Sequence, residues 1–205
     1  MKIHHVPGSR SCRVLWLLEE LGLEYTVEQR SILDGSLRTP EYVALNPLGR
    51  VPTIEDQGTS FYESGAIVQS VLERFGEGRL EPSVDAPARG PFLQWCWWGE
   101  ATLLPPLASI NANRFVLREE DRSEKALDVS RRQLARILRV LEAALGDRPF
   151  LVEDRFTAAD IMVGYGLQLA STVGELDPVS PRLADWLATL AARPAFEKAF
   201  AGGFG

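Results

Sequence analysis

Hydrophobic positions alternate between strand-like runs and helical stripes in the first third of the chain. Residues 2–6 predict a short strand that Pro7-Gly8-Ser9 ends. Apolar residues then recur at helical spacing over residues 11–21, and Gly22 is of the type that commonly ends a helix. The same reasoning predicts a strand at 25–27, a helix at 39–45, a hairpin over 52–62 and a helix at 64–75. The predicted order of these elements is βαβαββα.

The rest of the chain has the apolar spacing of helices. The helical patterns cover residues 87–118, 121–145, 158–173, 181–192 and 194–200. Pro105-Pro106 is expected to kink or split the first of them. The segment 158–173 is apolar on all sides, which predicts a buried core helix. Glycine, proline and charge cluster between the two parts, so we expect an α/β domain at 1–78, a linker at 79–86 and an all-helical domain at 87–205.

Composition narrows the class of protein without naming a function. The chain has 205 residues, a formal net charge of −6 and no long run of Lys and Arg, which argues against nucleic acid as a partner. Two cysteines are too few for a disulfide scaffold, and no His and Cys spacing suits a structural zinc. The N-terminus lacks the apolar run of a signal peptide, and no stretch is long enough to span a bilayer. We expect a cytoplasmic protein with no metal and no membrane partner.

The first segment with chemical potential is Asn46 to Thr53. A cis bond between Val51 and Pro52 would turn the N–H and C=O of Val51 outward, where they can pair with an extended peptide. Proline at the start of a strand normally lies at an edge or a bend. The alternative is a plain trans turn, and for an isolated dipeptide that alternative is favoured, because only about 5–6% of X-Pro bonds are cis.

The second segment is Glu63-Ser64, at the start of a predicted helix. Ser64 is a favoured N-cap residue, and a helix N-terminus attracts a carboxylate. Glu63 would repel a carboxylate, so its natural partner is an ammonium group on the same ligand. Together these residues fit the α-amino acid end of a ligand. The alternative is an ordinary helix cap beside a solvated glutamate.

The third segment is the turn from Pro7 to Arg13, where a redox C-x-x-C motif would lie in such a fold. Ser9 occupies the position of the first cysteine, which removes the exposed thiol, but its hydroxyl can donate a hydrogen bond to a bound thiolate. The helix N-terminus and Arg10 add positive potential. Helix capping alone is the alternative, and for Ser11 it is favoured. Cys12 is expected to be a buried, unreactive residue, and neither His4 nor His5 is an obvious base.

These three segments in this order give a family resemblance that covers nearly the whole chain. The strings are P-G-S-R-S-C-R-V-L-W-L-L-E-E-L-G at 7–22, N-P-L-G-R-V-P-T-I at 46–54 and Y-E-S-G-A-I-V-Q-S-V-L-E-R-F at 62–75. A fourth, F-T-A-A-D-I-M at 156–162, contains the spacing of a structural capping box at Thr157 and Asp160. The chain resembles the cytosolic glutathione transferases, in particular a serine-type branch found in bacteria and fungi.

The resemblance implies a thioredoxin-like N-terminal domain that binds glutathione as co-substrate, and an all-helical C-terminal domain. Ser9 matches the serine that hydrogen-bonds the glutathione sulfur, although Ser11 and Cys12 stay open as the contact. Val51 matches the residue before the cis-proline, Pro52, and pairs with the cysteinyl backbone. Glu63 and Ser64 match the residues that hold the γ-glutamyl end, and Arg50 lies where a basic residue often approaches the glycyl end. No tyrosine lies in the turn, and Cys12 does not match the cysteine of the cysteine-type branch.

The reaction implied by the resemblance is attack of the glutathione thiolate on a small hydrophobic electrophile, in a homodimer. The electrophile is expected between the domains, with Trp97, Trp98, Leu104 and Phe115 as candidate lining residues. Two alternatives use the same fold: a glutathione-dependent peroxidase or thiol-disulfide reductase, and a non-catalytic binding module. A reductase needs an exposed cysteine at the turn, which Ser9 argues against. The intact set of Ser9, Val51-Pro52 and Glu63-Ser64 weighs against loss of glutathione binding.

Overall fold

The computed structural model describes residues 1–176 and 180–203 and divides the chain into two compact units. The N-terminal unit comprises Met1–Leu80 together with Ala192–Gly205, and the helical unit comprises Glu81–Ala191. The final segment thus groups with the first part of the chain. The domain boundaries expected from the sequence, including the linker at 79–86, stay a prediction.

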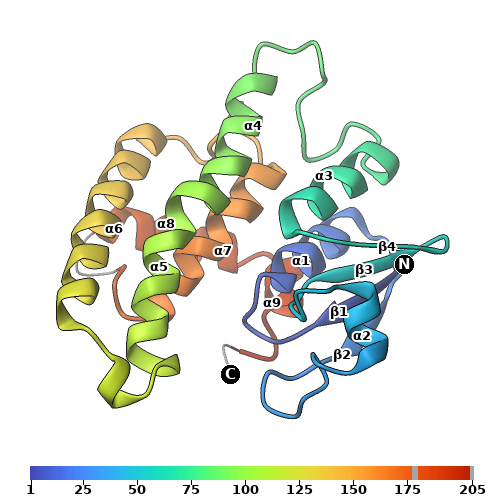
Figure 1. Cartoon of the computed structure of the whole chain (residues 1–205). Helices are drawn as coiled ribbons and strands as arrows, with labels where there is room; N and C mark the ends of the chain where they lie inside the picture. Colours follow the sequence, from blue (N-terminus) through green and yellow to red (C-terminus); the bar gives the residue numbers. More distant parts are fainter. Residues whose placement is uncertain (177–179, 204–205) are drawn as a thin grey trace. The chain divides into compact units, whose positions relative to one another are not determined.

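The N-terminal unit contains a four-stranded mixed sheet and follows the predicted βαβαββα order (Figure 1). Its elements are β1 (Lys2–His5), α1 (Ser11–Leu21), β2 (Thr26–Gln29), α2 (Pro40–Leu45), β3 (Thr53–Asp56), β4 (Thr59–Tyr62) and α3 (Ser64–Phe75), with α9 (Pro194–Ala199) added from the end of the chain. The strand order is β2-β1-β3-β4, in which β1 and β2 are parallel and the other pairs antiparallel. The fold class expected from the sequence is confirmed for this part.

Helices α1, α3 and α9 pack together within this unit, and their apolar residues form its core. Trp16 of α1 is fully buried and makes an edge contact with Phe196 of α9, with ring centroids 4.9 Å apart. Gly22 ends α1 in the left-handed conformation at φ 65°, as its sequence position predicts, because a residue without Cβ adopts that conformation without strain. Side chains alternate along β1, so His4 and His5 point to opposite faces of the sheet.

Among the described residues of the helical unit, regular secondary structure is helical apart from an isolated β-bridge between Val152 and Arg155. The helices and helical turns are α4 (Arg89–Trp98), the π-helical turn η1 (Gly99–Leu103), α5 (Leu104–Asn111), the π-helical turn η2 (Ala112–Val116), the 3₁₀ turn η3 (Glu119–Asp121), α6 (Glu124–Leu145), α7 (Ala158–Thr172) and α8 (Pro181–Ala191). Pro105 and Pro106 lie in the first turn of α5, directly after η1, which fits the expected interruption of the helix.

The core of the helical unit is built around α7, the helix predicted to be buried. Each of its first ten residues is buried, which confirms that prediction. The turn η1 approaches it closely at Gly99, where a Cβ would lie 2.9 Å from the carbonyl carbon of Met162. Helix α6 begins at Glu124 after a Ser123 N-cap, slightly later than the sequence pattern suggested. No helix among the described residues is long and apolar enough to cross a membrane.

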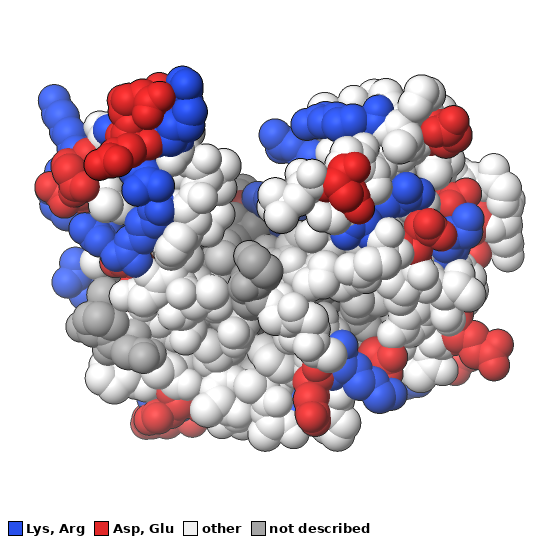
Figure 2. Space-filling view, turned by 90° about the horizontal axis from the view of Figure 1, so that it is seen from below, with Lys and Arg blue, Asp and Glu red and all other residues white. Residues whose placement is uncertain are grey.

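The surface carries both signs of charge. On the face shown in Figure 2, acidic and basic side chains lie interspersed. Among the ion pairs of the described residues, Arg118 contacts both Glu120 at 3.1 Å and Asp121 at 2.9 Å. This mixture fits the modest net charge of −6.

Candidate functional site

The register of the sheet brings the three segments singled out by sequence to one edge of the N-terminal unit. His4 of β1 is paired with Thr53 of β3, and Thr53 is in turn paired with Tyr62 of β4. Because both pairs are antiparallel, β1 and β4 end at this point and β3 begins there. The edge therefore carries the turn with Ser9, the Val51-Pro52 bond and Glu63-Ser64.

The peptide bond between Val51 and Pro52 is cis, as the sequence analysis predicted. The carbonyl of the preceding residue, Arg50, is held in place by buried side chains. It accepts hydrogen bonds from Tyr42 Oη at 2.5 Å and from Asn46 Nδ2 at 2.8 Å. Thr53 Oγ1 links to both of these side chains, at 2.9 Å and 3.1 Å respectively. The loop is thus fixed from behind by a polar cluster that leaves its outer side open.

Sequence reasoning did not assign a role to Tyr42, Asn46 or Thr53. All three are buried, at 0%, 1% and 0% exposure. Asn46 and Thr53 are the first and last residues of the N-P-L-G-R-V-P-T string. Their polar side chains at its two ends were the only local indication of this cluster in the sequence. Tyr42 comes from α2 and joins the cluster through tertiary packing alone, which no local pattern reveals.

The backbone of Val51 is available to a ligand. Across residues 1–176 and 180–203, no hydrogen bond uses its N–H or its C=O. Val51 is half-buried, Pro52 is buried and Arg50 is exposed. A backbone donor and acceptor at an exposed loop can pair with an extended peptide in the manner of an added strand.

The start of α3 differs from the expectation in one respect. Ser64 was predicted to be the N-cap, but the N-cap is Glu63, which makes no cap bond through its side chain. Ser64 is the first helical residue, and its buried hydroxyl accepts a hydrogen bond from Arg13 Nη1 at 3.2 Å. Glu63 is exposed and adopts a φ of 78°, a conformation that residues with a side chain rarely occupy.

The first turn of α3 offers backbone donors. Among the described residues, no hydrogen bond involves the N–H groups of Ser64, Gly65 or Ala66, whereas Ile67 N–H begins the helical ladder by donating to Glu63. Uncommitted N–H groups and the helix dipole make such an end attractive to a carboxylate. The Arg13 guanidinium, which is fully buried, adds positive charge behind the Ser64 hydroxyl.

Ser9 lies in the turn before α1 and is half-buried. Its Oγ is 2.7 Å from Ser11 Oγ, and it accepts a hydrogen bond from the Ser11 N–H at 3.2 Å. Ser11 Oγ is also 2.7 Å from His5 Nδ1. The expectation that Ser11 acts as a helix cap is wrong, because the N-cap of α1 is Arg10 and the fully buried Ser11 hydroxyl turns back toward β1.

Cys12 is fully buried, and burial raises the pKa of its thiol to about 12. A thiol with such a pKa carries almost no thiolate at neutral pH, and the thiolate is the reactive form. The sequence-based prediction that Cys12 is buried is therefore confirmed, and the raised pKa of its thiol supports the expected lack of reactivity.

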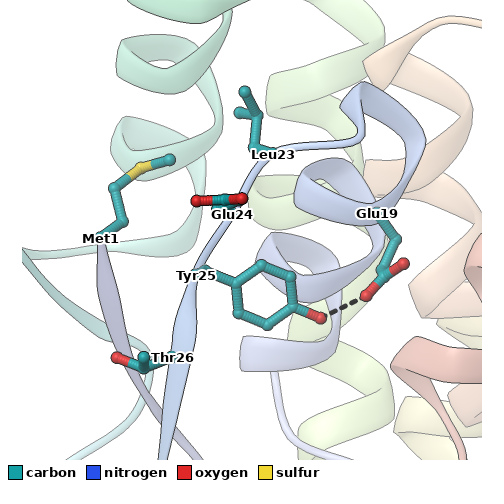
Figure 3. A pocket seen from close by; sticks show the side chains of 6 residues that line it. All are labelled: Met1, Glu19, Leu23, Glu24, Tyr25 and Thr26. Atoms are coloured by element: carbon teal, nitrogen blue, oxygen red, sulfur yellow. Dashed lines mark hydrogen bonds between the residues drawn. The ribbon is translucent and has the colours of Figure 1, made fainter.

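A surface pocket lies away from this edge, between the end of α1 and the start of β2 (Figure 3). Its lining residues are Met1, Glu19, Leu23, Glu24, Tyr25 and Thr26. The main polar groups there are already paired, because Tyr25 donates to Glu19 at 2.5 Å and Lys198 pairs with Glu19 at 2.7 Å. Burial raises the pKa of Tyr25, so this tyrosine keeps its proton. The pocket contains none of the residues predicted for the site.

Within the described part of the chain, no group of three or more His, Cys, Asp or Glu side chains could hold a metal ion.

Two family models match the chain. The model described as glutathione S-transferase, N-terminal domain, covers residues 1–73, and the one described as glutathione S-transferase, C-terminal domain, covers residues 118–189.

Relatives and solved structures of the same kind match over almost the full length. Glutathione S-transferase 4 of Zea mays is 32% identical over 91% of this chain and 85% of its own. Glutathione S-transferase GstB of Escherichia coli K12 is 30% identical over 91% and 90%. The theta class glutathione S-transferase of Xanthomonas axonopodis pv. citri, solved with glutathione bound, is 28% identical with a TM-score of 0.84 over 100% of this chain and 98% of that one.

Proposed function

Because this chain belongs to the glutathione S-transferase family, we propose that it binds glutathione at the sheet edge of the N-terminal unit and transfers it to a small hydrophobic electrophile. The observation that carries this proposal is the register of β1, β3 and β4. That register gathers a serine hydroxyl, an open backbone pair and a helix N-terminus at one edge. These groups match the sulfur, the cysteinyl peptide and the α-amino acid end of one tripeptide.

Each end of glutathione has a counterpart in this arrangement. The N–H and C=O of Val51, presented beside Pro52, pair with the cysteinyl backbone. The Ser64 hydroxyl and the first N–H groups of α3 hold the γ-glutamyl carboxylate, and the Glu63 carboxylate holds its ammonium group. The exposed Arg50 is available to the glycyl carboxylate. The affinity therefore comes mainly from backbone groups and charges at fixed positions.

The Ser9 hydroxyl donates a hydrogen bond to the sulfur and favours its ionised form. A free thiol has a pKa of about 8.5, so a depression of roughly two units makes the thiolate the main species at neutral pH. The thiol proton leaves to solvent, the thiolate forms a sulfur–carbon bond with the electrophile, and a leaving group departs with the bonding electron pair. In an addition reaction, the electrophile instead takes up a proton from solvent.

Binding and the role of Ser9 are tested by calorimetry and turnover in the wild type, Ser9→Ala and Cys12→Ala. We expect the wild type to bind glutathione, and Ser9→Ala to lose about a hundredfold in turnover, the scale of losing one donor to a developing anion. Cys12→Ala should keep its activity. The opposite pattern would favour the thiol-disulfide reductase, and absence of binding at millimolar glutathione would favour a non-catalytic module.

The type of electrophile is tested with a panel of aryl halides, epoxides, hydroperoxides and disulfides. We expect turnover with aryl halides or epoxides. Turnover confined to hydroperoxides would show a peroxidase that uses the same thiolate. The homodimer, the cytoplasmic location and the serine-type branch stay predictions from the family resemblance, and sedimentation velocity tests the first of them.

A further inference from the structure

Behind Ser9 lies a chain of three side chains joined by short hydrogen bonds. Ser9 Oγ is 2.7 Å from Ser11 Oγ, and Ser11 Oγ is 2.7 Å from His5 Nδ1. Ser9 is half-buried, whereas Ser11 and His5 are both buried, at 0% and 7% exposure. The chain therefore leads from the predicted sulfur position into the interior of the N-terminal unit.

The backbone fixes the three side chains relative to one another. The Ser11 N–H donates to Ser9 Oγ at 3.2 Å, and the Val6 N–H donates to Ser11 Oγ at 3.3 Å. Both serines thus accept a backbone hydrogen bond at the turn between β1 and α1. His5 is the last residue of β1 and follows the alternation that places its ring on the face opposite to His4. His4 makes separate contacts with Glu55 at 2.8 Å and Arg30 at 3.2 Å.

Because each hydroxyl has a single proton, the hydrogen bonds that join Ser9, Ser11 and His5 can run in only two directions: toward the interior or out toward the sulfur. Each serine hydroxyl has one proton to donate. If Ser9 donates to Ser11, it has no proton left for a sulfur. If Ser9 donates outward, the 2.7 Å contact between the serines requires Ser11 to donate to Ser9. Ser11 then has no proton for His5, and their 2.7 Å contact requires a proton on His5 Nδ1.

The direction of these hydrogen bonds depends on which ring nitrogen of His5 carries the proton. Burial lowers the pKa of the His5 imidazole to about 4, so the ring is neutral at physiological pH and carries a single N–H. That N–H can be on Nδ1, where it permits Ser11 to donate to Ser9, or on Nε2, where it leaves Nδ1 as an acceptor for the Ser11 proton. The longer contact of Ser11 Oγ with the Val6 carbonyl, 3.2 Å, competes for the Ser11 proton and also leaves Ser9 pointing inward.

We propose that His5 is a positioning residue for the glutathione thiolate: protonated at Nδ1, it donates to Ser11, Ser11 donates to Ser9, and the Ser9 hydroxyl is left to donate to the sulfur. This inference rests on the proposed function, in which Ser9 contacts the sulfur. His5 does not touch glutathione, and it acts through the two serines. A hydrogen bond whose donor itself accepts one is strengthened by polarisation, so His5 also strengthens the bond from Ser9.

The test is the pKa of the thiol of bound glutathione, followed by the ultraviolet absorption of the thiolate as pH is varied. Against the wild type, we expect His5→Phe and Ser11→Ala each to raise this pKa by about one unit, which is a tenfold loss of thiolate at a given pH below it. The double variant should shift the pKa no further than the larger single change, because both substitutions interrupt one chain.

Two controls separate positioning from a general structural effect. S-methylglutathione has no thiol proton, so its affinity should be the same in all of these variants and the wild type. His4→Phe alters a buried histidine next in sequence but outside the chain, and it should leave the thiol pKa unchanged. Asparagine places an amide nitrogen close to the position of Nδ1, so His5→Asn should reverse most of the pKa shift seen in His5→Phe and return the thiol pKa toward that of the wild type.

The outcomes divide cleanly. If Ser9→Ala raises the thiol pKa while His5→Phe and Ser11→Ala do not, the role of His5 is overturned and the proposed function stands. Equal losses of affinity for glutathione and S-methylglutathione, or a His5→Asn variant with the pKa of His5→Phe, would also overturn it. If Ser9→Ala itself leaves the thiol pKa unchanged, the proposed role of Ser9 fails instead. Should His5→Phe not fold, Ser11→Ala interrupts the same chain one link further on.

Discussion

The N-termini of α3 and α7 differ in whether the protein itself supplies hydrogen-bond acceptors for the backbone N–H groups at the start of the helix. Helix α7 begins with a capping box, in which the Thr157 N–H donates to the Asp160 carboxylate at 2.8 Å and the Leu151 N–H donates to the same side chain at 2.9 Å. Thr157 and Asp160 are both fully buried. Helix α3 begins after Glu63, which has a φ of 78° and makes no side-chain cap bond.

This difference separates a helix end that serves stability from one that, in the proposed function, serves binding. Every helix leaves its first N–H groups without helical partners. The capping box of α7 engages the protein's own carboxylate there, so the helix end is closed to ligands. The end of α3 keeps its donors available and accepts a backbone conformation that costs about 1–3 kcal/mol. A ligand carboxylate can then take the place that Asp160 occupies in α7.

The largest effect is expected from breaking the closed end. Asp160→Ala leaves the buried N–H groups of Leu151 and Thr157 without an acceptor, and it should lower the free energy of unfolding by about 3 kcal/mol. Urea denaturation measures this loss. Asp160→Asn, which keeps one acceptor oxygen, should lose clearly less. Glutathione affinity of the folded protein should not change, and a large loss of affinity would show that the two helix ends do not have separate roles.

A smaller effect is expected from the open end. Ser64→Ala removes a hydroxyl that we propose binds the γ-glutamyl carboxylate, and glutathione affinity should fall about tenfold, as for one hydrogen bond to a charged group. The matched change is Ser123→Ala, which removes the N-cap of α6, where Ser123 Oγ accepts from the Ala126 N–H at 3.3 Å. That variant should lose about 1 kcal/mol of stability with no change in affinity. Calorimetry of both variants measures the expected loss of affinity in Ser64→Ala, and denaturation of both measures the expected loss of stability in Ser123→Ala.

The smallest effect is expected at Glu63, where a substitution at the start of α3 should increase stability. Glu63→Gly removes the conformational strain at φ 78° and should raise the free energy of unfolding by about 1 kcal/mol, while glutathione binding weakens through loss of the carboxylate. Glu63→Ala is the control, because it loses the carboxylate but keeps a Cβ. It should bind as weakly as Glu63→Gly without the gain in stability. Equal stability in the two variants would mean that the positive φ is not strained.

Much of the fold follows from local patterns in the sequence. Residues 64–75 form a helix with the predicted bounds, and the βαβαββα order is confirmed, because each of these elements has its own periodicity and its own breaking residues. The second strand lies at 26–29 rather than 25–27, since neighbouring strands decide where pairing begins. The grouping of residues 192–205 with the N-terminal unit depends on contacts between distant residues, which no local pattern encodes.

The site was predictable where a motif fixes the backbone and not where tertiary contacts fix a hydroxyl. The cis bond before Pro52 and the burial of Cys12 were predicted correctly. The cap of α3 was assigned to Ser64 because serine is a common N-cap, but the turn after β4 places Glu63 there. Ser11 and His5 were not linked in the sequence analysis, since their contact depends on how the turn from residue 6 to residue 10 folds back on β1.

The contact between α1 and α9 has a consequence for the order in which the protein can fold during synthesis. Arg193 donates two hydrogen bonds of 2.6 and 2.7 Å to Glu20, and the ring of Phe196 contacts that of Trp16. A ribosome translates residues 81–191 between these partners. The N-terminal unit therefore lacks its last helix until the entire helical unit has been made, and Trp16 lacks its contact with Phe196 in a nascent chain of the first 80 residues.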